Sequence, residues 1–453
     1  MMKKQQKKLL LTALALLQLT ACGFKPGTEY APLTEVQQSQ VPTWSSQAEA
    51  VQAATLFDLL DSEQLRALVQ EAFTANPGLK QTRLSLQIAK AELRQTRGSR
   101  LPQAAADLSG SKEESSDESY TGSLTIRWTI DLWLKLADET AAANMDVAQQ
   151  AALVQAASDT LAAEVMKTWL ELIAQSHSVA IQERRLATLE KNEQYILERY
   201  RNGLGELEDL DSARSSTSSA RATLVEYREN FNRLQRTLRI LLGKSNKDSV
   251  AIPSEYPAVL IPLADLPEQT LARRPDLQAA YYAIASADLE TSVAYKELLP
   301  SISLGATLQD VGSSPSSLLF NDPLWSILGQ LTAPLFQGGS LKAAADKAQL
   351  EAAKSFQAYR ETLLTAVQEV EDALGYEQEL IQRITHINAA LTSARNSLQT
   401  YRQSYRTGLV DILDLLTVQK KTYDLEIELD ELMYQQLANR IDLGLALGLG
   451  VTE

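Results

Sequence analysis

The chain has 453 residues, is 45% hydrophobic and 22% charged, and carries a formal net charge of −14. A chain this acidic repels phosphate backbones, so we expect no nucleic-acid partner. Its one cysteine, Cys22, permits no internal disulfide, and stability must therefore come from packing.

Residues 1–21 have the pattern of a secretory signal. Four lysines come first, an apolar run from Leu9 to Leu19 follows, and the stretch ends at Ala21-Cys22. The run is shorter than the ~20 apolar residues with which a helix crosses a bilayer. We expect residues 1–21 to be cleaved, and because they contain four lysines and no acid, the formal net charge then falls from −14 to −18.

The end of this signal, Leu19-Thr20-Ala21-Cys22, resembles the bacterial lipobox, in which the cysteine becomes lipid-modified. The resemblance implies a diacylglycerol and a palmitoyl group on Cys22 and no other cofactor. Gly23, which follows the cysteine, resembles the pattern of lipoproteins sorted to an outer membrane.

An internal repeat follows the signal. Asn76-Pro77-Gly78-Leu79 returns as Arg274-Pro275-Asp276-Leu277, and Tyr200-Arg201-Asn202-Gly203-Leu204 returns as Tyr405-Arg406-Thr407-Gly408-Leu409. We therefore predict an N-terminal extended segment over residues 22–60, a first structural repeat over 61–255 and a second over 256–453.

Each repeat is predicted to contain a pair of strands. Apolar and polar residues alternate from Gln103 to Glu114 and from Tyr120 to Trp133, and the second repeat offers Ser301 to Gln309 and Leu324 to Leu335. Strands this short can span an outer membrane, where ~9–11 tilted residues suffice, provided that several chains combine so that no edge stays unpaired in lipid.

Each strand pair leads into a helical hairpin. Ala137 to Tyr200 and Ser340 to Arg406 contain no proline and almost no glycine, and shorter helices are predicted from Glu206 to Leu242 and from Asp411 to Leu447. A row of residues at steps of seven runs from Leu363 to Tyr405 and is largely apolar. A seven-residue step indicates coiled-coil packing.

Taken in order, these motifs resemble the outer-membrane efflux protein family, the family of TolC, and within it the lipoprotein branch that serves resistance-nodulation-division pumps. Besides the lipobox and the repeated motifs, the match rests on Leu299-Pro300-Ser301-Ile302 and Pro334-Leu335-Phe336-Gln337-Gly338-Gly339. The resemblance covers nearly the whole mature chain. It implies an α+β membrane protein with internal duplication: a homotrimer in which four strands per chain form a twelve-stranded β-barrel, continued by a long α-helical coiled-coil barrel.

The implied function is that of a passive exit duct in the outer membrane. A periplasmic adaptor and an inner-membrane transporter would be its partners, with outer-membrane lipids around the barrel and drugs or other small molecules as cargo. A type I protein-secretion channel, a metal-efflux channel and a structural periplasmic coiled-coil lipoprotein are the alternatives, although the last does not explain the duplicated strand pairs.

The two Tyr-Arg-x-Gly-Leu corners are each followed by acids, and we expect them to form the periplasmic mouth. Single acids at helix starts more often complement the helix dipole, but threefold symmetry would repeat each one into a ring that favours cations. Cations such as Arg406 or Lys420, or a bound cation, would offset the repulsion. The candidate gate residues are Asp411, Leu413, Asp414, Glu206, Glu208, Asp209 and Asp211.

No catalytic site is predicted. His177 and His386 are the only histidines, they have no metal-ligand spacing around them, and we expect both at the surface. Neither a nucleophile motif nor a phosphate-binding loop is present in the sequence, so an enzymatic function, such as that of a periplasmic hydrolase, is not supported.

Overall fold

The computed structural model describes residues 29–41, 44, 53–112, 114, 117–245, 250–262, 271–314 and 323–451. The predicted signal peptide 1–21 and the predicted lipidation site Cys22 lie outside these residues. Within the described ranges, no helix combines the length and the apolar character that crossing a membrane requires. The chain divides into a first unit, Met1–Gln40, Leu84–Leu153 and Asp276–Thr362, and a second unit, Val41–Arg83, Val154–Pro275 and Leu363–Glu453.

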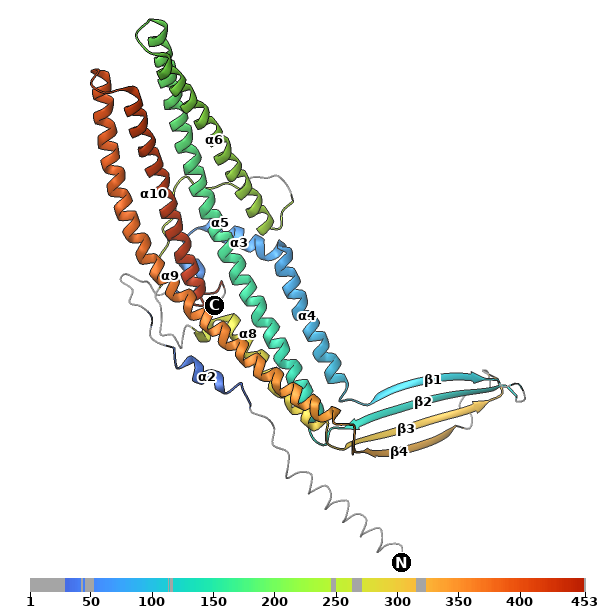
Figure 1. The fold of residues 1–453 in the computed structure, drawn as a ribbon. Helices are drawn as coiled ribbons and strands as arrows, with labels where there is room; N and C mark the ends of the chain where they lie inside the picture. Colours follow the sequence, from blue (N-terminus) through green and yellow to red (C-terminus); the bar gives the residue numbers. More distant parts are fainter. Residues whose placement is uncertain are drawn as a thin grey trace, which may run out of the picture. The chain divides into compact units, whose positions relative to one another are not determined.

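One order of elements occurs twice along the chain (Figure 1). It is first α4 (Pro77–Gly98), β1 (Gln103–Ser111), β2 (Ser119–Ile130), α5 (Lys135–Arg201) and α6 (Leu207–Leu241). It is then α8 (Pro275–Lys296), β3 (Ser301–Gly312), β4 (Leu324–Thr332), α9 (Ser340–Arg406) and α10 (Ile412–Ala446). Corresponding helices are equal in length, with 22 residues in α4 and α8, 67 in α5 and α9, and 35 in α6 and α10. Within the described residues, three short elements precede them: α2 (Leu33–Gln38), the 3-10 helix η1 (Leu56–Asp58) and α3 (Glu63–Ala75).

The four strands of the first unit form one antiparallel sheet in the order β1-β2-β3-β4 (Figure 1). The predicted strand pairs are confirmed, but all four strands end elsewhere than predicted. β1 ends at Ser111 and not at Glu114, and β3 continues past Gln309 to Gly312. β2 ends at Ile130 and β4 at Thr332, so Trp133 and Leu335 lie beyond the strands. Asp131 is the reason at β2, because its carboxylate accepts the backbone N–H groups of Leu136 and Ala137 at 3.0 and 2.8 Å and so starts α5.

The register gives this sheet one apolar face and one mainly polar face, on which Val311, Leu324 and Leu328 are the exposed apolar exceptions. Leu124 stands opposite Leu308, and Leu308 opposite Trp325, whereas Thr125 stands opposite Thr307 on the other face. Side chains alternate between faces along a strand, so the alternation read from the sequence separates them. The exposed large residues of the apolar face are Leu108, Leu124, Ile126, Trp128, Leu304, Trp325, Ile327 and Leu331.

In the second unit, α5 pairs with α6 and α9 with α10 as two helical hairpins (Figure 1). The seven-residue row of α9 is confirmed as a packed seam, because Leu363, Val370, Leu391 and Leu398 are all buried. Its polar member, Glu377, is also buried, and its charge is paired with Arg440 of α10 at 2.9 Å.

The main core lies midway along α5 and α9 and at the C-terminal ends of α6 and α10. Trp169 of α5, Leu238 of α6, Val370 of α9 and Ile441 of α10 belong to one cluster of buried side chains, together with residues of η1 and α3. Each Å² of apolar surface removed from water contributes about 25 cal/mol to the free energy of unfolding. Since the chain can form no internal disulfide, this cluster is its main source of stability.

Candidate functional site at the hairpin turns

Two turns of nearly identical geometry close the hairpins. In the first, the N–H of Leu204 donates to the carbonyl of Arg199 at 2.9 Å; in the second, the N–H of Leu409 donates to the carbonyl of Ser404 at 2.9 Å. Gly203 and Gly408 each adopt φ 72°, which an L side chain rarely adopts. The glycine of the repeated Tyr-Arg-x-Gly-Leu motif is thus explained, since it ends each long helix with a left-handed residue.

The residue that begins the next helix differs between the two turns. Asp411 is the N-cap of α10, and its carboxylate accepts the backbone N–H of Leu413 at 3.2 Å. Glu206 occupies the same place before α6 but makes no side-chain cap bond. A carboxylate at a helix start is stabilised by the helix dipole. Capping of α10 is therefore enough to explain an acid at position 411, without a role in a gate.

A small core joins the two turns within the second unit. Ile196 and Leu210 of the first hairpin pack with Leu398, Ile412 and Leu415 of the second. The rings of Tyr195 and Tyr405 meet edge to face, with centroids 6.2 Å apart, and burial raises the pKa of the Tyr405 phenol. The structure therefore brings the two sets of predicted gate residues to one end of one unit.

The predicted gate residues lie around this small core, mostly in solvent. Leu413 is 39% exposed, and Asp209 is half-buried. Asp211 forms an ion pair with Arg214 at 3.7 Å. The remaining acids are exposed: Glu206, Glu208, Asp411 and Asp414. Among the residues that the structure describes, Arg406 and Lys420 form no ion pair with Asp411 or Asp414 inside one chain.

A hollow of about 350 Å³ lies beside Leu413, between the hairpins. Leu413, Leu416 and Lys420 line it from α10, and a row of serines lines it from α6: Ser212, Ser215, Ser216 and Ser219. The serine row was not predicted to be part of this site. Its spacing of three, four and seven residues places it on one helix face, which is the signal that identifies it in the sequence.

His177 is half-buried, with 26% of its side chain exposed, so it lies at the surface as predicted but is held by specific partners. Its Nδ1 lies 2.8 Å from the Asp430 carboxylate, its Nε2 lies 2.8 Å from the Ser254 carbonyl, and its ring packs edge to face on Tyr256. Burial raises the pKa of Asp430. His386 is exposed, as predicted. No cluster of three potential metal ligands occurs within the described part of the chain.

Known proteins resemble the chain along nearly its whole length. The family model for "Outer membrane efflux protein" matches residues 68–244 and 266–449. The cation efflux system protein CusC of Escherichia coli O6:H1 is 26% identical over 96% of this chain and 97% of its own. The probable outer membrane lipoprotein SilC of Salmonella typhimurium is 24% identical over 86% of this chain and 87% of its own.

A solved structure shares the fold. The open state of the MtrE outer membrane channel of Neisseria gonorrhoeae aligns with a TM-score of 0.81 at 22% identity, and the alignment covers 95% of this chain and 98% of that one. Since the family model matches well over half of the chain in two blocks, the chain belongs to the outer membrane efflux protein family.

Proposed function

We propose that three copies of this chain form a twelve-stranded barrel through the outer membrane. The observation that carries the proposal is the sheet, whose apolar face is exposed. Among the residues that the structure describes, its outer strands, β1 and β4, each have one edge without a partner strand. In lipid every backbone polar group needs a partner, so an open sheet cannot enter a bilayer alone. Pairing β4 of one copy with β1 of the next removes both edges and turns the apolar face to lipid.

The hairpins then continue the barrel as a tunnel. At 1.5 Å per residue, the 67 residues of α5 or α9 extend over ~100 Å. Their seam packs helix against helix, as a coiled-coil wall requires. The repeats would follow the predicted boundaries, 61–255 and 256–453.

In this assembly the chain is the passive exit duct of an efflux system. A periplasmic adaptor and an inner-membrane transporter of the resistance-nodulation-division type supply the cargo, and the duct itself carries out no chemistry. Cys22 carries lipid, in keeping with the lipoprotein SilC. The turns form the periplasmic mouth, where the acids described above repeat into rings that favour cations.

The test is a recording from the purified protein in planar bilayers. We expect trimers that conduct ions and prefer cations, because the mature chain is acidic. Monomers without conductance, or trimers with a marked anion preference, would contradict the proposal. Cys22→Ser with a cleavable signal should still give membrane-inserted trimers, because one lipid anchor adds little to a barrel that spans the bilayer.

Metal efflux is the second candidate for the cargo. The observation in its favour is the similarity to CusC, a cation efflux protein, over 96% of the chain. Deleting the gene and measuring growth separates the two. Sensitivity to metal cations supports metal cargo, and sensitivity to antibiotics alone supports drugs.

A further inference from the structure

A second hollow, of about 790 Å³, lies where the strands of the first unit meet its helices. Its walls come from the β2–α5 link, the α8–β3 link and the β4–α9 link, and they are mainly apolar: Leu132, Trp133, Leu136, Leu299, Leu335 and Phe336. Leu335 is 93% exposed and Phe336 88% exposed, which makes them the most exposed of the large apolar side chains in the described chain. A volume of this size suits a drug-sized or lipid-like ligand.

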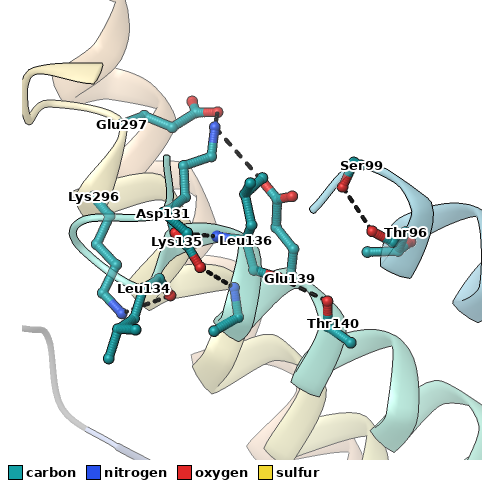
Figure 2. A network of polar contacts seen from close by, with 11 residues as sticks. Thr96, Ser99, Asp131, Leu134, Lys135, Leu136, Glu139, Thr140, Lys296 and Glu297 are labelled. Carbon is teal, nitrogen blue, oxygen red and sulfur yellow. Dashed lines mark hydrogen bonds and ion pairs between the residues drawn. The ribbon is translucent and has the colours of Figure 1, made fainter. Parts of the chain in front are cut away.

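Lys135 and Lys296 line this junction hollow. Figure 2 shows the polar contacts of both lysines. Lys135 Nζ lies 3.1 Å from Glu297 and 3.5 Å from Glu139. Lys296 Nζ donates to the Leu134 carbonyl at 3.3 Å and pairs with Asp138. Ammonium groups beside apolar walls match an amphiphile whose ester carbonyls accept hydrogen bonds and whose chains are apolar.

The start of the described chain is attached to the same unit. The backbone N–H groups of Tyr30 and Ala31 donate to Oδ2 of Asp288, on α8, at 2.9 and 2.8 Å. The Tyr30 ring lies 5.6 Å from that of Phe356, on α9. Eight residues farther along, Gln38 donates to the Tyr359 hydroxyl at 2.9 Å. The leader formed by residues 29–38 is therefore held on two helices, and Asp288 is its first anchor point.

The segment between Cys22 and this anchor point is long enough to span the distance to the hollow. From Asp288 to Lys296, which lines the hollow, α8 runs eight residues, or ~12 Å. Cys22 stands eight residues before Tyr30, and eight extended residues span up to ~26 Å. The sulfur of Cys22 can therefore lie at the rim of the hollow.

We propose that this junction hollow binds an acyl chain of the lipid on Cys22, so that the lipid anchors the chain to its own fold as well as to the membrane. The inference rests on the lipidation of Cys22 in the proposed function. A membrane phospholipid or a neighbouring copy could compete for the apolar walls. We commit to the lipid on Cys22 because its tether is short and its attachment point, Tyr30 and Ala31 on Asp288, lies on the same helix as the hollow.

A photoreactive palmitate tests the proposal in the full-length protein. Cells take up a diazirine-bearing palmitate, the membranes are irradiated, and the purified trimer is digested and mapped by mass spectrometry. We expect the Cys22 lipid to be cross-linked to peptides that contain residues 299–301 or 334–337. Cys22 lipid that is cross-linked only to free phospholipid or to other segments overturns the proposal, as does a phospholipid cross-linked to the hollow.

The controls separate this proposal from the proposed function. A wild-type Cys22 peptide without label refutes lipidation and the hollow together, whereas a labelled peptide with cross-links elsewhere refutes only the hollow. Leu335→Ser should lower the cross-link yield about tenfold, because the acyl chain would no longer cover the apolar side chain of Leu335 when it binds. Leu409→Ser removes a leucine of similar exposure, 78%, from a hairpin turn and should leave the yield unchanged.

Discussion

The middle of the second unit and its hairpin turns are built from the same four helices but are packed very differently. In the middle, Trp169 and Leu238 are fully buried in a large cluster, and buried charges have partners. Arg274 donates to the Ala446 carbonyl at 2.9 Å and pairs with Glu369 at 2.7 Å. At the turns only a small cluster joins the hairpins, and most of the acids there are exposed.

The two regions therefore have different roles. The packed middle sets the free energy of unfolding, and the turns are where the two hairpins can separate. The few apolar contacts at the turns mean that local separation of the two hairpins there costs little, whereas separation in the middle would expose the main core. A mouth at the turns can therefore open while the middle stays intact.

The largest loss of stability is expected from Trp169→Ala. A tryptophan removed from a closed core costs about 3–5 kcal/mol, since the lost contacts leave a cavity. Thermal unfolding of the detergent-solubilised protein, followed by circular dichroism, should show a strongly lowered midpoint, whereas Leu204→Ala, at a turn, should leave it near that of the wild type. Equal unfolding midpoints for the two variants would show that the turns contribute as much to stability as the middle does.

Glu377→Gln is expected to cost less. Glu377 accepts hydrogen bonds from Nε and Nη2 of Arg440 at 3.0 and 2.9 Å, and from Asn439 at 3.3 Å. The amide keeps the size but removes the charge, so about 1.5–3 kcal/mol is lost, the range for hydrogen bonds to charged groups. Arg383→Gln is the matched control, because its ion pair with Glu379 is exposed. Equal unfolding temperatures for the two variants would show that the buried Glu377–Arg440 pair stabilises the protein no more than the exposed pair does.

Asp159 gives the middle of the unit a pH dependence. Its buried carboxylate accepts the N–H of Val451 at 3.0 Å and the Gln155 amide at 2.9 Å, but burial outweighs these bonds and raises its pKa to about 6. An unfolded aspartate titrates near ~3.9, so the stabilisation from the protonated form is complete below about pH 4 and is lost as the pH rises through 6.

Asp159→Asn removes this titration and keeps an oxygen that accepts the same bonds. The variant's unfolding midpoint should exceed that of the wild type at pH 8, and the gap should close toward pH 4. Midpoints that stay a constant distance apart across this range would show that Asp159 does not titrate there.

The smallest loss of stability is expected at the turns, where the change in conductance is largest. Leu413→Ala should cost about 0.5 kcal/mol or less, as substitutions at exposed positions do, and should widen the mouth. Asp411→Ala combined with Asp414→Ala should weaken cation binding there. Both changes should raise single-channel conductance and make cells sensitive to large antibiotics.

Leu391→Ala is the control, because it removes a buried seam residue and should lower stability without opening the channel. If the turn variants fold normally and conduct like the wild type, the mouth is closed elsewhere, and the acids from Glu206 to Asp211 are the next positions to change.

Much of the fold could be predicted from the sequence because it depends on local periodicity. Ser340 to Arg406 was predicted as one helix, and α9 has the same bounds. The strand pairs and both glycine turns also follow from patterns in adjacent residues. The end of β2 was predicted wrongly at Trp133, because apolar residues continue past the strand, and only the capping bonds of Asp131 show where the helix begins.

The sites were harder to predict because they depend on contacts between distant segments. The sequence identified acids at the turns, but not that Tyr195 packs on Tyr405 across 210 positions. Asp288 resembles any helix-surface acid until its partners, Tyr30 and Ala31, are known. The partner of His177, Asp430, is 253 residues away from it, so no local pattern could show that the two side chains meet.

The two open edges of the sheet have a consequence for how the protein reaches its membrane. A newly exported copy presents unpaired backbone groups on β1 and β4 and an apolar face between them, so it is prone to stick to any extended peptide it meets. In the proposed trimer these edges close only when three copies meet, so biogenesis depends on local copy number and on chaperones that shield the edges. The same closure makes mutations in the edge strands dominant, because a copy with a defective edge can join two intact copies and disable the whole trimer.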